Sequence, residues 1–367
     1  MGTGVEFLWH HPAIADRFAT GVCLHGHTLH SEECLSFLPR YLRMIPGMGP
    51  VVRGYERAGA DFGRAFWTPP LTPASALALE REQIVRLGLR PVVSLTDHDN
   101  LEAGMALQVT ADRHSVPISV EWTVPYRRSI FHLGIHNLPP QTARGWLEAM
   151  TEFTLSPAED QLPPLLRALA AIPDAIVVLN HPFWREEGVD ENDHPPALRH
   201  LLAECVAFIH AFELNGTRPW CENANTIELA REFLRPVISG GDRHACEPAA
   251  CINLTNARSF SEFAAEVRGG KSQVIFLAQY RESLAMRVLE ATWDVLRNYP
   301  EYPGRERWTD RVFYRSEDGI AMPLSKVWGR GAPWMVRGAA GMVELAATTR
   351  LRQALRLLLM RRGEILP

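Results

Sequence analysis

Two histidines one residue apart are the first place in this chain where the residue types could do chemistry. His25 and His27 follow residues 21–24, a short and mostly apolar run that is typical of a buried strand. Side chains at positions i and i+2 of a strand point to the same face, so both imidazoles can reach one ion. Neutral imidazole is the commonest metal-binding side chain. By itself this pair is weak evidence for a metal site, because histidines two residues apart occur by chance on many strands.

The ends of the other predicted strands carry the same kinds of side chain. These strands are apolar runs at residues 91–95, 118–124, 130–135, 175–179, 207–214 and 236–239. Along them or just after them stand His, Asp or Glu residues, namely Asp97, His98, Glu121, His132, His181, Asp242 and His244. In parallel α/β barrels the active site is built at the carboxyl ends of the strands. The collection therefore predicts a site for several metal ions rather than scattered core histidines.

The order of these elements predicts the fold class. Apolar strands that alternate mostly with helical segments are typical of a parallel sheet, and seven of them suggest closure into a barrel. We expect one barrel domain over residues 1–280, with an insertion at residues 34–70 that overhangs the metal site. Residues 281–367 are expected to form a helical appendage that packs on the barrel or mediates self-association.

Composition and charge narrow the class of protein. The 367 residues are 46% hydrophobic and 22% charged, which is ordinary for a globular protein. The formal net charge is −4, whereas a protein that binds nucleic acid usually has a basic surface. The six cysteines form no CxxC pair, which favours a reducing compartment. We find neither a secretory signal nor an apolar run long enough to span a bilayer, and we expect a cytoplasmic protein.

Five short motifs, in order along the chain, resemble the polymerase-and-histidinol-phosphatase (PHP) family of metal-dependent phosphoesterases. The resemblance covers about residues 21–278. The motifs are Leu24-His25-Gly26-His27-Thr28 with Ser31-Glu32, Thr96-Asp97-His98-Asp99, Val120-Glu121 with Phe131-His132-Leu133-Gly134, Asn180-His181-Pro182, and Gly241-Asp242-Arg243-His244-Ala245. Each motif is short, and their common order at strand ends is what makes the resemblance specific.

The resemblance implies a distorted (β/α)7 TIM-like barrel and two or three divalent metal ions. One ion would be held by His25, His27, Glu121 and Asp242. Glu121 would bridge to a second ion, which His132 and His181 also bind. A third ion would be held by Glu32, His98 and His244.

Metal ions in such a cluster activate water and clamp phosphoryl oxygens. The mixture of imidazole and carboxylate suits Mn, Fe or Zn, and the absence of cysteine ligands argues against a structural zinc site. Asp97 could orient a ligand or accept a proton, or simply cap the helix after it. Candidates to grip phosphate are Arg185, Arg243 and either Arg127 or Arg128, each of which could equally be a solvated surface charge.

These features predict a phosphoesterase that acts on a small-molecule phosphate mono- or diester. Two alternatives remain: a nuclease or proofreading module, which the acidic balance disfavours, and a non-catalytic regulatory module that binds metal, which the near-complete ligand set disfavours. The C-terminal segment contains a stretch rich in apolar residues and arginine. Instead of packing on the barrel, a basic amphipathic helix there could lie on an anionic membrane surface.

Overall fold

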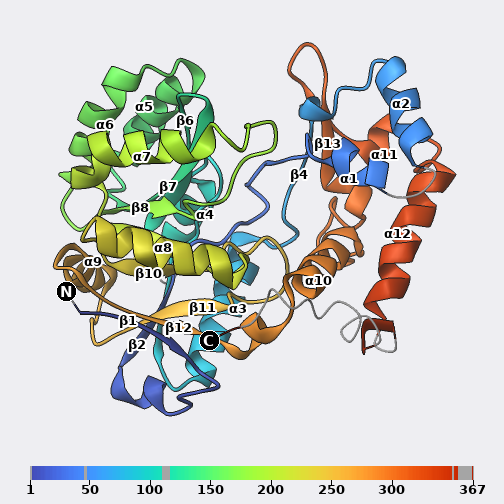
Figure 1. The fold of residues 1–367 in the computed structure, drawn as a ribbon. Coiled ribbons are helices and arrows are strands. Elements are labelled where there is room, and N and C mark those ends of the chain that lie inside the picture. The colour runs from blue at the N-terminus through green and yellow to red at the C-terminus, as the bar shows by residue number, and fades with distance from the viewer. Residues whose placement is uncertain (1, 45–47, 110–115, 349–350, 354–365, 367) are drawn as a thin grey trace.

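A computed structural model describes residues 2–44, 48–109, 116–348, 351–353 and 366 of the chain. In this part of the chain the architecture is mixed α/β, with two five-stranded sheets and a smaller four-stranded sheet (Figure 1). Part of the expected C-terminal appendage, at residues 349–350, 354–365 and 367, lies outside the described residues.

The first sheet contains the strand that precedes His25 and His27. Its order is β1 (Gly2–Phe7), β12 (Lys271–Phe276), β11 (Cys251–Thr255), β2 (Thr20–Cys23) and β5 (Arg90–Val93). Strand β2 pairs in parallel with β5, so both strands deliver their carboxyl ends to the same edge. Strand β11 runs antiparallel to both β12 and β2.

The second sheet contains the other strands that lead into the predicted site. Its order is β10 (Val237–Gly240), β9 (Ala211–Asn215), β8 (Ile176–Asn180), β7 (Ser129–Leu138) and β6 (Ile118–Tyr126). The three strands β8, β9 and β10 run parallel to one another, and every residue in them is buried. Burial on both faces explains why these strands are mostly apolar, with polar residues such as Asn180 and Asn215 near their carboxyl ends.

The expected (β/α)7 barrel is wrong, because among the described residues neither sheet closes on itself. No strand-to-strand ladder joins the two sheets among the described residues. Isolated bridges pair Gly26 with Arg243, Leu95 with Ile118, and His98 with Glu121, and Asn253 on β11 accepts a hydrogen bond from the N–H of Ser239 on β10. Strands β6 and β7 form an antiparallel hairpin whose loop is Arg127-Arg128. A parallel pair needs a crossover of a dozen or more residues, so two consecutive strands joined by such a short loop cannot continue a parallel barrel.

Helices cover the two larger sheets. They are α3 (Pro73–Arg86), α4 (Glu102–Gln108), α5 (Ala143–Leu155), α6 (Leu162–Ala170), α7 (His194–Cys205), α8 (Trp220–Glu232) and α9 (Phe260–Arg268). Short 3-10 turns lie at η1 (Ile14–Arg17), η2 (Phe62–Arg64), η3 (Glu159–Gln161), η4 (Val206–Phe208), η5 (Ala278–Arg281) and η6 (Trp308–Asp310). Helix α3 begins after Thr72, whose side chain caps it by accepting a hydrogen bond from the Ser75 N–H.

The third sheet joins the insertion to the C-terminal segment. Strands β3 (Glu33–Cys34) and β4 (Ala65–Trp67) come from the insertion, and β13 (Val312–Arg315) and β14 (Ala321–Pro323) from the C-terminal segment, in the order β14-β13-β4-β3. The same region holds α1 (Leu38–Met44), α2 (Gly49–Arg57), α10 (Leu284–Leu296), α11 (Leu324–Val327) and α12 (Trp334–Ala347), at the right of Figure 1. None of the described helices combines the length and apolar character that crossing a membrane requires.

One buried arginine holds the C-terminal segment together. Arg311 is 0% exposed, and its guanidinium donates to the backbone carbonyls of Val295, Arg297, Arg305 and Glu306 at 2.6–3.2 Å. The guanidinium also lies over the Tyr299 ring, 4.9 Å from its centroid. The Arg311 carbonyl accepts the N–H of Thr68, which follows β4. This one residue therefore ties the end of α10 to the insertion.

We predict that Arg311→Met will loosen the C-terminal segment. The substitution leaves four buried carbonyls without their donor, which should cost about 2–4 kcal/mol of unfolding free energy. Denaturant unfolding and limited proteolysis between residues 281 and 348 would measure the effect. Lys326→Met, at an exposed position of α11, is the matched control and should behave like the wild type. Equal protease resistance in both variants would contradict the role given to Arg311.

Candidate metal centre

Eight of the nine predicted metal ligands lie together where the edges of the two larger sheets meet. His25 and His27 follow β2, His98 follows β5, Glu121 lies on β6, His132 on β7, His181 follows β8, and Asp242 and His244 follow β10. Most of these side chains are buried, and those of His98 and His244 are 18% and 24% exposed. That any of them binds a metal ion stays a prediction.

The carboxylate of Glu121 is the centre of this group. Its Oε2 lies 2.8 Å from His25 Nε2, 3.3 Å from His27 Nε2 and 3.4 Å from His98 Nδ1. Its Oε1 lies 3.1 Å from His181 Nε2 and 3.5 Å from His132 Nδ1. Burial by itself raises the pKa of Glu121, but the surrounding imidazoles outweigh it and hold this pKa well below the ordinary value. The carboxylate is thus ionised and faces five imidazole rings.

The two histidines of the HxH pair aim at one point. Their Nε2 atoms are 3.1 Å apart, and Nδ1 of His25 lies 2.6 Å from Oε2 of Glu213. Burial by itself lowers the pKa of His25, but the carboxylates of Glu121 and Glu213 outweigh it and hold this pKa well above the ordinary value. If a metal ion displaced the Nε2 proton, Glu213 would keep the proton on Nδ1 and the Nε2 lone pair would point into the cluster. Burial lowers the pKa of His27 to about 3, which keeps that ring in the neutral form that binds metals.

The backbone at this centre is strained. His25, His181 and Asp242 have φ angles of 57°, 25° and 46°, in the left-handed region that side chains rarely adopt. Such conformations cost of order 1–3 kcal/mol each and persist only where surrounding contacts enforce them. Three of them among the predicted ligands indicate that the site has been assembled at the expense of local stability.

A second group lies beside the first and includes Glu33 rather than Glu32. Oε2 of Glu33 is 3.2 Å from His244 Nε2 and 3.6 Å from His98 Nε2, and Oε1 is 3.8 Å from His27 Nδ1. The Glu33 side chain is 13% exposed. The Glu32 side chain, the ligand implied by the resemblance, is 54% exposed and pairs with Arg315 on β13. Glu32 immediately precedes β3, and the two neighbouring side chains point to different sides of the chain, Glu33 inward and Glu32 towards Arg315.

The donor atoms of these groups suit divalent metal ions. Four sets have ligand atoms within 4.8 Å of one another: His27 with Glu33, His98 and His244; His25 with His27 and Glu121; His25 with His181 and Glu213; and His98 with Glu121 and His132. Nδ1 of His132 is buried and has no hydrogen-bond partner among the described residues, as expected for a nitrogen reserved for an ion. Imidazole and carboxylate sets of this kind fit Zn, Mn or Fe.

The three residues predicted to be catalytic lie around this centre with other partners. Asp97 is buried and accepts hydrogen bonds from the backbone N–H and the hydroxyl of Thr28, at 2.5 and 2.8 Å. Burial raises the pKa of Asp97 to about 6. Its contacts place it beside the chain that carries His27, where it holds the backbone in position.

Within the described residues, the hydrogen bonds of the two predicted arginines go to Glu80 and to backbone carbonyls. Arg243 is 4% exposed and donates to Glu80 Oε1 at 2.9 Å, to the Ala245 carbonyl at 2.9 Å and to the His27 carbonyl at 3.1 Å. Arg185 donates to the Val189 carbonyl in its own loop. Of the two hairpin arginines, Arg127 pairs with Glu159, and the Arg128 side chain is 84% exposed.

Arg218 is a cation at this site that the sequence interpretation missed. Its Nη2 lies 3.3 Å from Asp242 Oδ2, and its guanidinium lies over the Trp184 ring at 4.8 Å. Trp184 in turn lies against the rings of His132 and His181, at 5.4 and 5.3 Å between centroids. Nε of Arg218 is buried, and no residue in the described part of the chain accepts a hydrogen bond from it. The residue follows β9 just as the predicted ligands follow their strands, and this position is the signal that could have identified it.

Glu213 on β9 stands near the end of a predicted strand but was not among the predicted site residues. Beyond its contact with His25, its Oε1 accepts a hydrogen bond from Asn215 Nδ2 at 2.6 Å, and the same amide also reaches Asp242 Oδ2 at 3.1 Å. A Cβ atom at Gly240 would come within 2.1 Å of the Glu213 carboxylate. Glycine at this position of β10 therefore makes room for the carboxylate that orients His25.

No protein-family model matches the chain, and no curated protein matches it. Among solved structures, it is similar to PsfC from Pseudomonas syringae PB-5123, with 13% identity, 74% of this chain and 98% of that chain covered, and a TM-score of 0.42.

Two further similar structures have lower TM-scores. One is an amidohydrolase from Chromobacterium violaceum with bound sulfate and no metal. It is 14% identical, with 61% of this chain and 87% of that chain covered, and the TM-score is 0.36. The other is described as a metal-dependent phosphoesterase from Bifidobacterium adolescentis ATCC 15703. It is 13% identical, with 69% of this chain and 97% of that chain covered, and the TM-score is 0.34. At these TM-scores the likenesses carry no argument about this chain.

We predict that Glu33→Gln and Glu32→Gln will differ in metal content, although the residues are neighbours. Glutamine at 33 removes the charge that faces His244, His98 and His27, and should weaken metal binding there at least about tenfold. Glutamine at 32 removes only a partly exposed pair with Arg315. Elemental analysis of both purified variants after dialysis against trace metal would measure this. Loss of metal from Glu32→Gln alone would show that the inward-facing residue has been misassigned.

Proposed function

We propose that this protein is a metal-dependent phosphoesterase of the PHP type, which hydrolyses a phosphate ester of a small molecule. The observation that carries this proposal is the buried Glu121 carboxylate in contact with five imidazoles, beside an arginine with an unpartnered buried donor. Imidazole and carboxylate clusters of this density are built to hold more than one cation.

The proposed places for two or three ions follow the resemblance, with Glu33 in place of Glu32. His25, His27, Glu121 and Asp242 would hold one ion, Glu121, His132 and His181 a second, and Glu33, His98 and His244 a third. When bound, divalent ions supply Lewis acidity, which lowers the pKa of water towards neutrality and polarises phosphoryl oxygens. Mn, Fe and Zn each suit these ligands.

The chain's own residues would bind and orient the ester. Arg218 has a guanidinium edge that is not used by its contacts with Asp242 and Trp184, and a planar fork of N–H donors matches a phosphoryl group. Glu213 keeps His25 in one tautomer and orientation, and Asp97 fixes the backbone that carries His27.

The surroundings of the centre favour a small substrate over a nucleic acid. Trp67 of the insertion lies 6.1 Å from the His244 ring, and Arg40 on α1 pairs with Glu187 in the loop after β8, at 3.3 Å. Two segments far apart in sequence thus meet above the strand ends. A net charge of −4 would also repel a nucleic-acid backbone.

We expect Glu121→Gln to abolish turnover and remove at least one bound ion. Glutamine keeps the shape of the side chain but removes the charge that five imidazoles share, so activity should fall by orders of magnitude while the buried strands preserve the fold. The test measures phosphate release from a panel of small phosphate esters with Mn, Fe or Zn, together with metal content and circular dichroism.

Two controls make that experiment decisive. Glu102→Gln, which changes a half-exposed carboxylate on α4, should retain full activity. Single-stranded DNA in the same panel tests the nuclease alternative, and metal binding without turnover on any ester would favour the regulatory one. Full turnover and unchanged metal content in Glu121→Gln would overturn the proposed site.

Arg218→Gln should lower kcat/KM by about 100-fold without loss of metal. The substitution removes a charge-assisted contact with the phosphoryl group, whose loss typically costs 2–3 kcal/mol. Arg128→Gln, at a side chain that is 84% exposed, is the matched control. Steady-state kinetics and elemental analysis are needed together: loss of metal in Arg218→Gln would mean that the arginine serves only to hold Asp242.

A further inference from the structure

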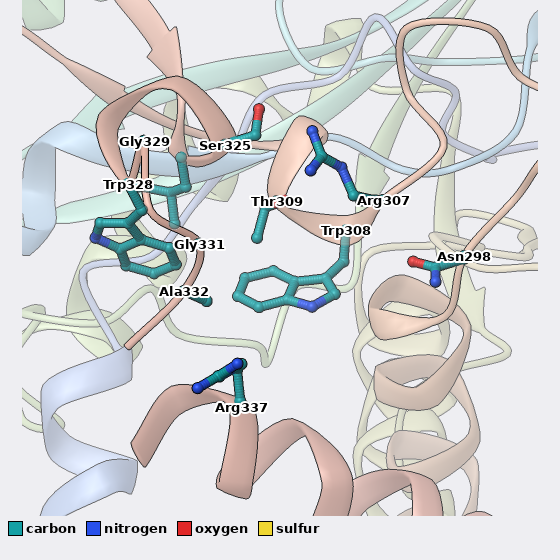
Figure 2. A pocket seen from close by; sticks show the side chains of 11 residues that line it. Asn298, Arg307, Trp308, Thr309, Ser325, Trp328, Gly329, Gly331, Ala332 and Arg337 are labelled. Carbon is teal, nitrogen blue, oxygen red and sulfur yellow. The ribbon is translucent and has the colours of Figure 1, made fainter. Parts of the chain in front are cut away.

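A cavity in the C-terminal segment lies apart from the metal centre. Its volume is about 300 Å³, and it opens between the end of α10, η6, α11 and the start of α12 (Figure 2). None of the residues of the metal centre lines it. This volume is at the lower end of the range for small-molecule sites, which suits a compound of one or two rings.

Two indole rings border this cavity. Trp308 and Trp328 have ring centroids 6.1 Å apart and planes at 72°, and both rings are partly exposed. Figure 2 shows both of them facing the same space, with the guanidinium of Arg337 below and between them. Exposed indoles offer flat, polarisable faces, and a planar ring that stacks on one of them also reduces the exposed apolar area.

The two arginines of the cavity are not equivalent. Arg307 is held by Asp310, with Nε 3.1 Å from Oδ2 and Nη2 3.1 Å from Oδ1, so its charge is already balanced. Arg337 is exposed in the first turn of α12 and forms no ion pair with any residue in the described ranges. The cavity therefore carries one uncompensated positive charge next to two aromatic faces.

We propose that this cavity binds a planar anion, namely an aromatic ring that carries a carboxylate or phosphate group. The ring would stack on Trp308 or Trp328, and the anionic group would pair with Arg337, while Thr309 and Ser325 line the wall. Binding needs no metal ion, because the cavity shares no residue with the metal centre. The proposal is independent of the phosphoesterase function.

Calorimetric titration of the metal-free full-length protein tests this proposal. The probes are indole-3-acetate and adenosine 5′-monophosphate, with indole-3-acetamide and adenosine as their neutral counterparts. At least one anion should bind saturably and about tenfold more tightly than its neutral counterpart, and the two pairs distinguish a carboxylate ligand from a phosphate ligand. If neither anion binds, or if the neutral compounds bind equally well, the proposal is overturned.

Three variants locate the binding. Arg337→Gln should weaken it about tenfold, whereas Arg330→Gln, at an exposed arginine nearby that does not line the cavity, should leave it unchanged. Arg218→Gln should also have no effect. Binding that survives Arg337→Gln, or that is lost in Arg218→Gln, would assign the anion to another place and refute the proposed site.

Discussion

The structure depends on one buried negative charge. An ionised carboxylate such as Glu121 is very costly to bury unless cations or hydrogen-bond donors surround it. Here imidazoles from four other strand ends meet that requirement, and this brings both large sheets to one place. The bridge between His98 and Glu121 is one of the few backbone connections between those sheets. The need to surround the buried Glu121 carboxylate therefore governs both the geometry of the centre and the way in which the two sheets meet.

Further buried charged residues hold the histidines around Glu121 and the chain segments that carry them in position. Arg243 links the last strand-end loop to Glu80 on α3, Asp97 fixes the chain that carries His27, and Glu213 orients the His25 ring. Each of these groups is buried, so none can be left without a partner at low cost. Their interactions offset the strained backbone at His25 and Asp242. This also explains why a buried arginine inside a site motif is not free to bind a substrate.

The insertion and the C-terminal segment add a third level of organisation. They share a sheet, and buried Arg311 connects that sheet to the end of α10. Through β3 and β4 this unit supplies Glu33 and Trp67 to the metal centre. Residues that lie outside the two large sheets therefore contribute to the candidate metal centre.

The sequence by itself determined which residue types stand at the strand ends, because apolar runs and the His, Asp and Glu that accompany them are local features. It therefore predicted eight side chains that the structure brings together, from His25 to His244. It did not determine how the strands pair: a two-residue hairpin loop at Arg127-Arg128 and separate sheets replaced the expected barrel.

Only the tertiary structure decided between Glu32 and Glu33, because the partner of Glu32 is Arg315, 283 residues away. The same holds for Arg218 and Arg243, whose roles depend on whether a distant carboxylate such as Glu80 neutralises the guanidinium. Residue type follows from the sequence, but the direction in which a charged side chain points is set by contacts between segments that are remote along the chain.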